Sequence, residues 1–237
     1  MFRTIWAVIV AIVVTIPLAI TVMIIALISS SSPWIDSVIR LWGRLMLWGA
    51  GIRIRGDGVE RIDRARRYIL IANHHSYFDI PCIFAAIPQP IRFMAKKSLF
   101  SIPIFGWAIG RAGFIPIDRK NRRTAVKSFD LAVDRIRKGN TIVIFPEEGR
   151  SHAPAMRPFQ RGAFLLAIRS ELPILPLAID GTYEAFKVGA RRITPGVVTV
   201  RVGTPIETVG LSVRAKDTLL DQSRAQIEAL LGLPHQP

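Results

Sequence analysis

The sequence predicts an α/β fold in which a mixed sheet is flanked by helices and preceded by an N-terminal membrane-anchoring helical segment. Three observations support this fold class. The chain begins with a long uncharged apolar run, and beyond Gly51 short apolar runs alternate with helical stretches. Its 237 residues also suffice for one domain with a sizeable core. We therefore expect an anchor with an interfacial helix over residues 1–50 and one globular domain over residues 51–237.

The apolar run extends from Ile5 to Ile28 without a charged residue. A helix of that length is about what is needed to cross a hydrocarbon layer roughly 30 Å thick. A cleaved signal peptide would have a shorter apolar region, of roughly 7 to 15 residues, so an uncleaved anchor is favoured. Because Pro17 removes a helical hydrogen bond in mid-run, a straight span, a kink and a re-entrant monotopic hairpin all stay open.

The next segment, residues 34–50, predicts an amphipathic helix. Trp34, Trp42 and Trp48 recur with aliphatic residues at helical spacing, whereas Arg40 and Arg44 lie elsewhere on the helix. Tryptophan and arginine on such a helix suit the headgroup layer of a membrane. The alternative is a helix that packs its aromatic stripe against the globular core.

Beyond Gly51, short apolar runs predict the strands of the sheet and longer periodic segments predict helices. The clearest helices are Arg122 to Lys138, ended by Gly139, and Val213 to Leu231. The predicted strands are Tyr68 to Ala72, Ile91 to Ala95, Phe114 to Ile117, Ile142 to Phe145, Ile174 to Ile179 and Val197 to Val202.

The formal net charge of +15 predicts polyanionic surroundings, which could be nucleic acid, anionic lipid or a phosphate-rich ligand. Basic clusters occur at 61–67, 119–123 and 191–192. Readers of single-stranded nucleic acid interleave aromatics with such charges, but most tryptophans here lie in or beside the anchor, so nucleic acid is not expected. The basic residues after the anchor favour a cytoplasmic location for the main domain.

Cysteine and histidine usage restricts the chemistry. With Cys82 as its single cysteine, the chain has no intramolecular disulfide, thiolate zinc site or CxxC redox pair. Its four histidines lack Asp or Cys at ligand spacing, so we predict no metal and no tightly bound cofactor.

The sharpest local feature is the segment from Asn73 to Asp79, which follows a predicted strand, where an α/β sheet places its ligand site. Asp79 can accept one ring N–H of His74 and leave the other ring nitrogen free as a base. This is the base and orienter of a catalytic triad without its serine. Alone the pair is a weak signal, because Asp79 could also cap a helix.

Further blocks give the pair its meaning, and with them the sequence resembles the glycerolipid acyltransferases, in particular 1-acylglycerol-3-phosphate acyltransferases. The third block differs from the usual Phe-Pro-Glu-Gly-Thr-Arg, because Glu148 and Gly149 stand where most members have Gly and Thr. The matching blocks are Asn73 to Asp79, Ala95 to Phe100, Gly113 to Arg119, Phe145 to Arg150 and Leu172 to Leu177.

The resemblance implies transfer of a fatty acyl group from a thioester donor, acyl-CoA or an acyl carrier protein, to the sn-2 hydroxyl of lysophosphatidic acid. The product would be phosphatidic acid for phospholipid biosynthesis, made by a catalytic domain at the cytoplasmic side of a bacterial-type inner membrane. His74 and Asp79 would be catalytic, with direct transfer and no acyl-enzyme on Ser76 or Cys82. The residues expected to bind substrate are Lys96, Arg119, Glu147 and Arg150, the guanidinium groups gripping the acceptor phosphate.

Alternatives remain at two levels. The acceptor could instead be glycerol 3-phosphate or lyso-ornithine lipid, because the same base and thioester chemistry serve either. The chain could also be a non-enzymatic, membrane-tethered polyanion-binding protein, although that function leaves Asn73 to Asp79 unexplained.

Overall fold

The computed structural model describes residues 2–118 and 122–234 and contains a mixed sheet, as predicted. The strands are ordered β1-β7-β6-β2-β5-β3-β4. Neighbouring strands are parallel except β6 and β7, so β1 and β7 run opposite to the rest. The strands are β1 (Ile52–Asp57), β2 (Ile69–Ala72), β3 (Ile91–Lys96), β4 (Ile115–Ile117), β5 (Thr141–Ile144), β6 (Ile174–Asp180) and β7 (Gly196–Val202).

The helices agree with the predicted ones, with two additions in detail. Residues Val213–Ala215 form a separate 3₁₀ turn before the last helix, and Gly139, with φ of +83°, follows α5 in the left-handed conformation that favours glycine. The helices are α1 (Phe2–Ile28), α2 (Pro33–Ala50), α3 (Asp79–Ala86), α4 (Phe105–Arg111), α5 (Arg122–Arg137), α6 (Gly162–Ser170), α7 (Thr182–Phe186) and α8 (Lys216–Leu231).

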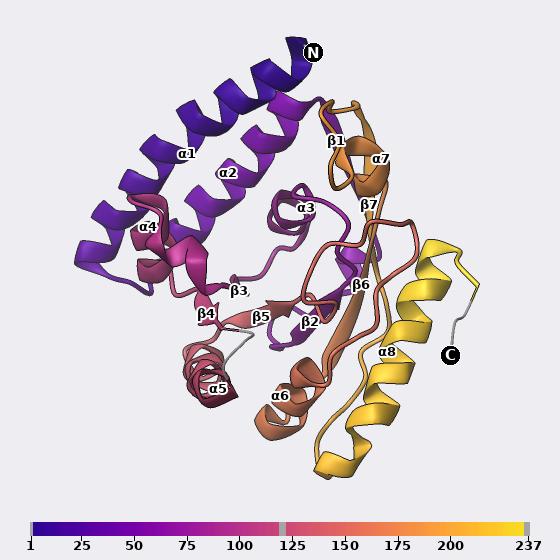
Figure 1. The fold of residues 1–237 in the computed structure, drawn as a ribbon. Helices are drawn as coiled ribbons and strands as arrows, with labels where there is room; N and C mark the ends of the chain where they lie inside the picture. Colours follow the sequence, from indigo (N-terminus) through magenta and orange to yellow (C-terminus); the bar gives the residue numbers. More distant parts are fainter. Residues whose placement is uncertain (1, 119–121, 235–237) are drawn as a thin grey trace.

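The sheet is covered on both faces, which explains why its central strand is apolar at every position. In β2, Leu70 and Ala72 belong to one core with α2 and α3, whereas Ile69 and Ile71 belong to a second core with α5, α6 and α8. Alternate side chains of a strand point to opposite faces, so a strand buried on both sides shows no polar alternation. Figure 1 shows α5, α6 and α8 on one side of the sheet and α2 and α3 on the other.

Helix α1 is continuous through Pro17, so the two-piece arrangement left open by the sequence does not form. It packs along α2 and is tied to the domain near both ends (Figure 1). Near the start, the Ile193 N–H donates to Thr4 Oγ1 over 3.1 Å, and near the end Val22 packs in one cluster with Ala108 of α4. The helix is long and apolar enough to cross a membrane, with 17% of its most apolar window buried.

Helix α2 packs against the domain on one face and leaves part of its aromatic surface exposed on another. Its Trp34 and Trp48 are exposed. Its opposite face is fixed to the domain by an ion pair between Asp36 and Arg92 of β3, with Nη1 and Oδ1 2.5 Å apart and Arg92 almost fully buried. Trp42 Nε1 donates to Thr15 of α1 over 3.0 Å, so the two helices form one hairpin on the sheet domain.

Candidate active site

The topology brings the sequence blocks to one edge of the sheet. Strands β2, β5 and β3 are adjacent and parallel, so their carboxyl ends lie side by side. The chain continues from β2 into His74, from β5 into Glu147, and β3 ends at Lys96. This is the edge at which open α/β sheets place their ligand sites.

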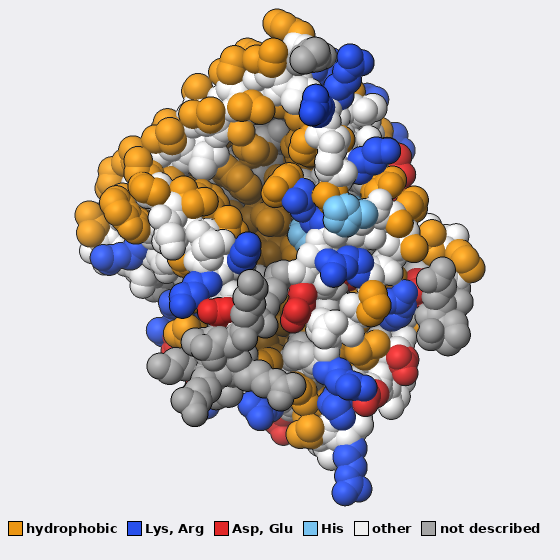
Figure 2. All heavy atoms as spheres, in the orientation of Figure 1, with side chains coloured by type: hydrophobic (Ala, Val, Ile, Leu, Met, Phe, Trp, Pro, Cys, Tyr) orange, Lys and Arg blue, Asp and Glu red, His pale blue; other side chains and the backbone are white. Residues whose placement is uncertain are grey.

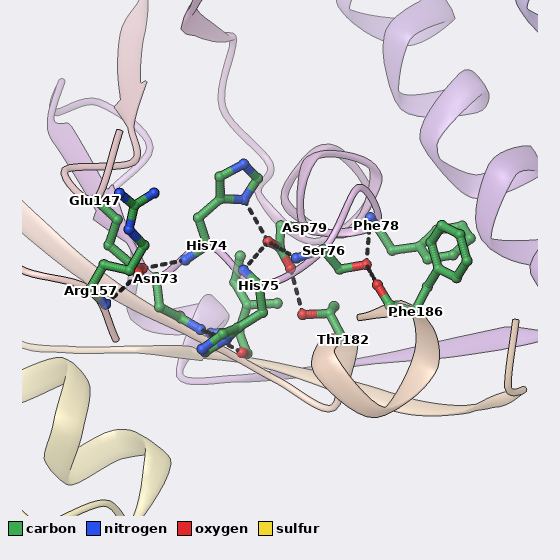
Figure 3. A network of polar contacts seen from close by, with 11 residues as sticks. Asn73, His74, His75, Ser76, Phe78, Asp79, Glu147, Arg157, Thr182 and Phe186 are labelled. Atoms are coloured by element: carbon green, nitrogen blue, oxygen red, sulfur yellow. Dashed lines mark hydrogen bonds and ion pairs between the residues drawn. The ribbon is translucent and has the colours of Figure 1, made fainter. Parts of the chain in front are cut away.

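The predicted contact between His74 and Asp79 is present (Figure 3). His74 Nδ1 lies 2.7 Å from Asp79 Oδ2. With the carboxylate as acceptor, Nδ1 carries the proton and Nε2 is the basic nitrogen. The imidazole stacks on Phe145, with ring centroids 4.0 Å apart and planes 12° from parallel. The side chain of His74 is 15% exposed, so the ring is held on one side and open on the other.

Asp79 is fully buried, and its two carboxylate oxygens have several hydrogen-bond donors. Oδ2 also accepts the backbone N–H groups of His75 and Ser76, each over 2.8 Å. Oδ1 accepts the Thr182 hydroxyl over 2.5 Å. A buried polar group needs hydrogen-bond partners, and these donors hold the Asp79 carboxylate in position beside His74.

Thr182 was not predicted as a site residue. It is the first residue of α7, separated from the end of β6 by Gly181, and it reaches Asp79 because β6 pairs with β2. Asn73 strengthens the same junction, because its amide oxygen accepts the Ile179 N–H over 2.7 Å and its amide nitrogen donates to the Ile179 carbonyl over 2.9 Å. The side chain of Asn73 therefore continues the hydrogen bonding of the sheet beyond the end of β2.

Glu147, predicted to bind substrate, is engaged by backbone groups in this structure. The residue is 2% exposed, and its oxygens accept the backbone N–H groups of His74 and Arg157, each over 2.7 Å. Burial raises the pKa of Glu147 to about 7, against the opposing effect of those two N–H groups. The carboxylate thus holds two loops together at the strand ends.

The altered third block keeps a glycine-like turn. Glu148 has φ of +53°, the left-handed conformation that a glycine adopts most easily, and its side chain is exposed. Its N–H donates to the Phe145 carbonyl over 3.1 Å, which closes the turn. The carboxylate at this position therefore projects away from the turn without changing its path.

The basic residues predicted to bind substrate lie around this edge. The Arg150 guanidinium stacks on the Tyr77 ring, 3.5 Å from the centroid. Lys96 is exposed at the end of β3. Arg119 lies outside the described residues. Among the residues that the structure describes, neither Arg150 nor Lys96 has a carboxylate partner, so both charges are available to an anion.

Neither side chain considered as an acyl-enzyme nucleophile is placed for that role. The Ser76 hydroxyl donates to the Phe186 carbonyl over 2.8 Å. Cys82 is fully buried, and burial raises the pKa of its thiol well above the ordinary value.

An apolar cavity opens beside the site. Figure 2 shows a hollow with hydrophobic walls between the α1–α2 hairpin and the sheet domain, with Lys, Arg and His side chains at its rim. Phe93 lines the cavity and stacks on Phe145, and Phe145 in turn stacks on the His74 ring. The remaining walls come from Leu18 and Val22 of α1, Val38 and Trp42 of α2, Ile80 and Phe84 of α3, and Phe105 and Ile109 of α4.

Comparison with known proteins agrees with these features. A family model described as acyltransferase matches residues 53–180. A coconut (Cocos nucifera) protein named 1-acyl-sn-glycerol-3-phosphate acyltransferase is 34% identical over 167 residues, which are 70% of this chain and 54% of that protein. A human protein named 1-acyl-sn-glycerol-3-phosphate acyltransferase alpha is 31% identical over 175 residues, 73% of this chain and 62% of that one. The chain thus spans between half and two thirds of these relatives.

One solved structure shares the whole fold. The crystal structure of the 1-acyl-sn-glycerophosphate (LPA) acyltransferase PlsC from Thermotoga maritima superposes with a TM-score of 0.82 and 22% sequence identity. The similarity covers 98% of this chain and 95% of that one, so the N-terminal hairpin and the sheet domain are both included.

Proposed function

Because this chain belongs to the acyltransferase family, we propose that it transfers a fatty acyl group from a thioester to the sn-2 hydroxyl of 1-acylglycerol 3-phosphate, forming phosphatidic acid. The observation that carries the proposal is the hydrogen bond between His74 Nδ1 and the buried Asp79, which leaves Nε2 as a base beside an apolar cavity and unpaired cations. The names of the coconut and human relatives support the acceptor.

In the proposed reaction, His74 Nε2 takes the proton of the acceptor hydroxyl as its oxygen attacks the thioester carbonyl carbon. The C–O bond forms, the C–S bond breaks, and the proton passes from the imidazolium to the departing thiolate. Asp79 fixes the tautomer and stabilises the imidazolium. The substrate hydroxyl takes the place of an enzyme serine, so transfer is direct and needs neither metal nor cofactor.

The residues around Asp79 act by positioning. Thr182 and the N–H groups of His75 and Ser76 keep the carboxylate oriented, while Glu147 holds the backbone of His74. General-base catalysis typically supplies about 10²–10⁴ in rate, so holding hydroxyl and thioester together must supply much of the rest.

Substrate binding divides between charge and apolar surface. Lys96, Arg150 and Arg119 bind the acceptor phosphate, with Arg150 held in place by the Tyr77 ring. The cavity between the hairpin and the sheet domain takes a fatty acyl chain, since its walls are almost wholly hydrocarbon. The donor is acyl-CoA or an acyl carrier protein thioester.

The α1–α2 hairpin is proposed to insert into one leaflet without spanning the bilayer. Its outer side carries Trp6, Trp34 and Trp48 together with exposed isoleucines along α1. Because α1 contacts the sheet domain near both ends, a perpendicular span would draw that domain into the membrane. The active site then faces the headgroups, at the cytoplasmic side of a bacterial-type inner membrane.

The test is an acyl-transfer assay in bicelles with lysophosphatidic acid, glycerol 3-phosphate and lyso-ornithine lipid as acceptors and both donor types. His74→Ala should lower kcat by about 10²-fold or more on the preferred acceptor, the contribution expected of a general base. His152→Ala is the matched control, because His152 is exposed and, in the part of the chain that the structure describes, its ring forms no hydrogen bond or ion pair. Undiminished transfer by His74→Ala would remove the proposed base.

A further inference from the structure

Arg157 occupies space that a side chain in the third block would fill. A Cβ added to Gly149 would lie 2.4 Å from Arg157 Nη1, closer than atoms can approach. The φ of Gly149 lies outside the left-handed region, so its backbone does not itself require glycine. The guanidinium at the end of the exposed Arg157 side chain thus occupies the space beside Gly149, and it would have to move to admit a side chain at position 149.

The backbone of Arg157 is joined to that of the proposed catalytic histidine through one carboxylate. The backbone N–H groups of Arg157 and His74 bind the two oxygens of one carboxylate, that of Glu147. Figure 3 shows the Arg157 guanidinium and the His74 ring extending to the same side of this carboxylate. Because Glu147 is buried and both of its oxygens are engaged, the backbone that carries Arg157 is fixed relative to His74.

Burial raises the pKa of Glu147, and the charge of Arg157 is among the smaller effects that lower it. In the part of the chain that the structure describes, the Arg157 guanidinium forms no ion pair and no hydrogen bond, and the Glu147 oxygens are taken by backbone N–H groups. Neighbouring arginines differ, since Arg161 pairs with Asp217 at 2.6 Å and Arg224 with Glu228 at 2.9 Å. An unpaired guanidinium on the same side of Glu147 as the His74 ring offers a planar site for an anion.

We infer that Arg157, whose guanidinium lies beside Gly149, binds a phosphate group of a substrate during acyl transfer. This inference rests on the proposed function and adds a residue to it. The phosphate belongs either to the acceptor or to the nucleotide part of the donor, and both present the same oxygens to a guanidinium. Glycine and arginine act as a pair, because a side chain at position 149 would displace the guanidinium.

The test compares Arg157→Ala, Gly149→Ala and the double variant with wild type in bicelles. KM is measured for lysophosphatidic acid against phosphate-free monoacylglycerol, and for acyl-CoA against acyl-pantetheine. Loss of one charge-assisted contact should raise KM about tenfold or more for one phosphate-bearing substrate and leave its phosphate-free counterpart unchanged. A change confined to lysophosphatidic acid assigns the phosphate to the acceptor, and a change confined to acyl-CoA assigns it to the donor. Arg161→Ala is the matched control, removing an exposed charge that is already paired.

The double variant tests whether Gly149 acts through the position of the Arg157 guanidinium. If Gly149→Ala acts by displacing the guanidinium, it adds nothing in the Arg157→Ala background. Changes in KM no larger than those of Arg161→Ala, or equal changes with and without the phosphate, would overturn the inference.

A binding measurement separates this inference from the proposed function. If wild type transfers no acyl group, the function fails, and calorimetry with glycerol 3-phosphate and adenosine 3′,5′-bisphosphate then tests the site directly. Weaker binding of either probe to Arg157→Ala supports the site. Equal binding by both proteins, or none by wild type, overturns it.

Discussion

Replacing Thr182 by Val tests whether the donors around Asp79 act on catalysis. The Thr182 hydroxyl is 2.5 Å from Asp79 Oδ1 and both residues are fully buried, so the isosteric change leaves that oxygen without this donor. A hydrogen bond to a charged group contributes about 1.5–3 kcal/mol. Since about 1.4 kcal/mol corresponds to tenfold, we expect kcat to fall roughly 10- to 100-fold if most of this energy orients the His74 partner.

The assay measures kcat and KM for acyl transfer together with thermal unfolding. Thr182→Ser keeps the hydroxyl and should retain most activity. Thr208→Val is the matched control, because the Thr208 hydroxyl is also buried but donates to the Leu172 carbonyl over 2.9 Å, away from the site. Both valine variants should lose comparable stability, by about 2–4 °C per kcal/mol for a domain of this size. If kcat falls equally little in both, the reasoning about Thr182 is refuted.

Three further predictions follow from single contacts. Burial raises the pKa of Glu147 from 4.5 to about 7, so the folded state binds this proton more tightly than the unfolded state does. The stability of wild type relative to Glu147→Gln should therefore fall as pH rises from about 4.5 to 7. Denaturant unfolding at pH 5 and 7.5 checks this, and the exposed Glu148→Gln variant is a control that should show no such trend. Tyr77→Leu should raise KM for lysophosphatidic acid severalfold by releasing the guanidinium stacked on it, whereas Tyr77→Phe keeps the ring and should not; equal kinetics of the two variants would exclude the stacking role. Asp36→Ala should destabilise the protein by about 3–5 kcal/mol, because it leaves Arg92 buried and unpaired; a loss under 1 kcal/mol in denaturant unfolding would show that water or another group satisfies that charge.

Local patterns in the sequence predicted most elements of this fold. The run from Ile5 to Ile28, the apolar strand at 69–72 and the helix ended by Gly139 all depend on spacing along the chain, which propensity and burial determine directly. Strand β1 was missed, because it lies at the edge of the sheet and Arg53 and Arg55 interrupt its apolar residues. Its pairing with β7, far along the chain, is what makes it a strand.

The same division applies to the candidate site. His74 and Asp79 could be paired from sequence because five residues separate them and both lie in one turn. Thr182 could not, because it reaches Asp79 only through the pairing of β6 with β2. Glu147 was singled out from its block, but its two backbone contacts were not predicted, since a motif does not indicate whether a carboxylate accepts backbone N–H groups.

The sequence by itself determined the fold class, the apolar N-terminal helix and the contact between His74 and Asp79, because these features rest on periodicity and on contacts within one turn. Only the tertiary structure decided that α1 lies along the domain as half of a hairpin, that Asp79 has a distant hydroxyl donor and that the Arg157 guanidinium lies beside Gly149. These features depend on which strands and loops become neighbours. Burial of the whole sheet between its helices determines which strands and loops become neighbours, and no short stretch of the sequence predicts this.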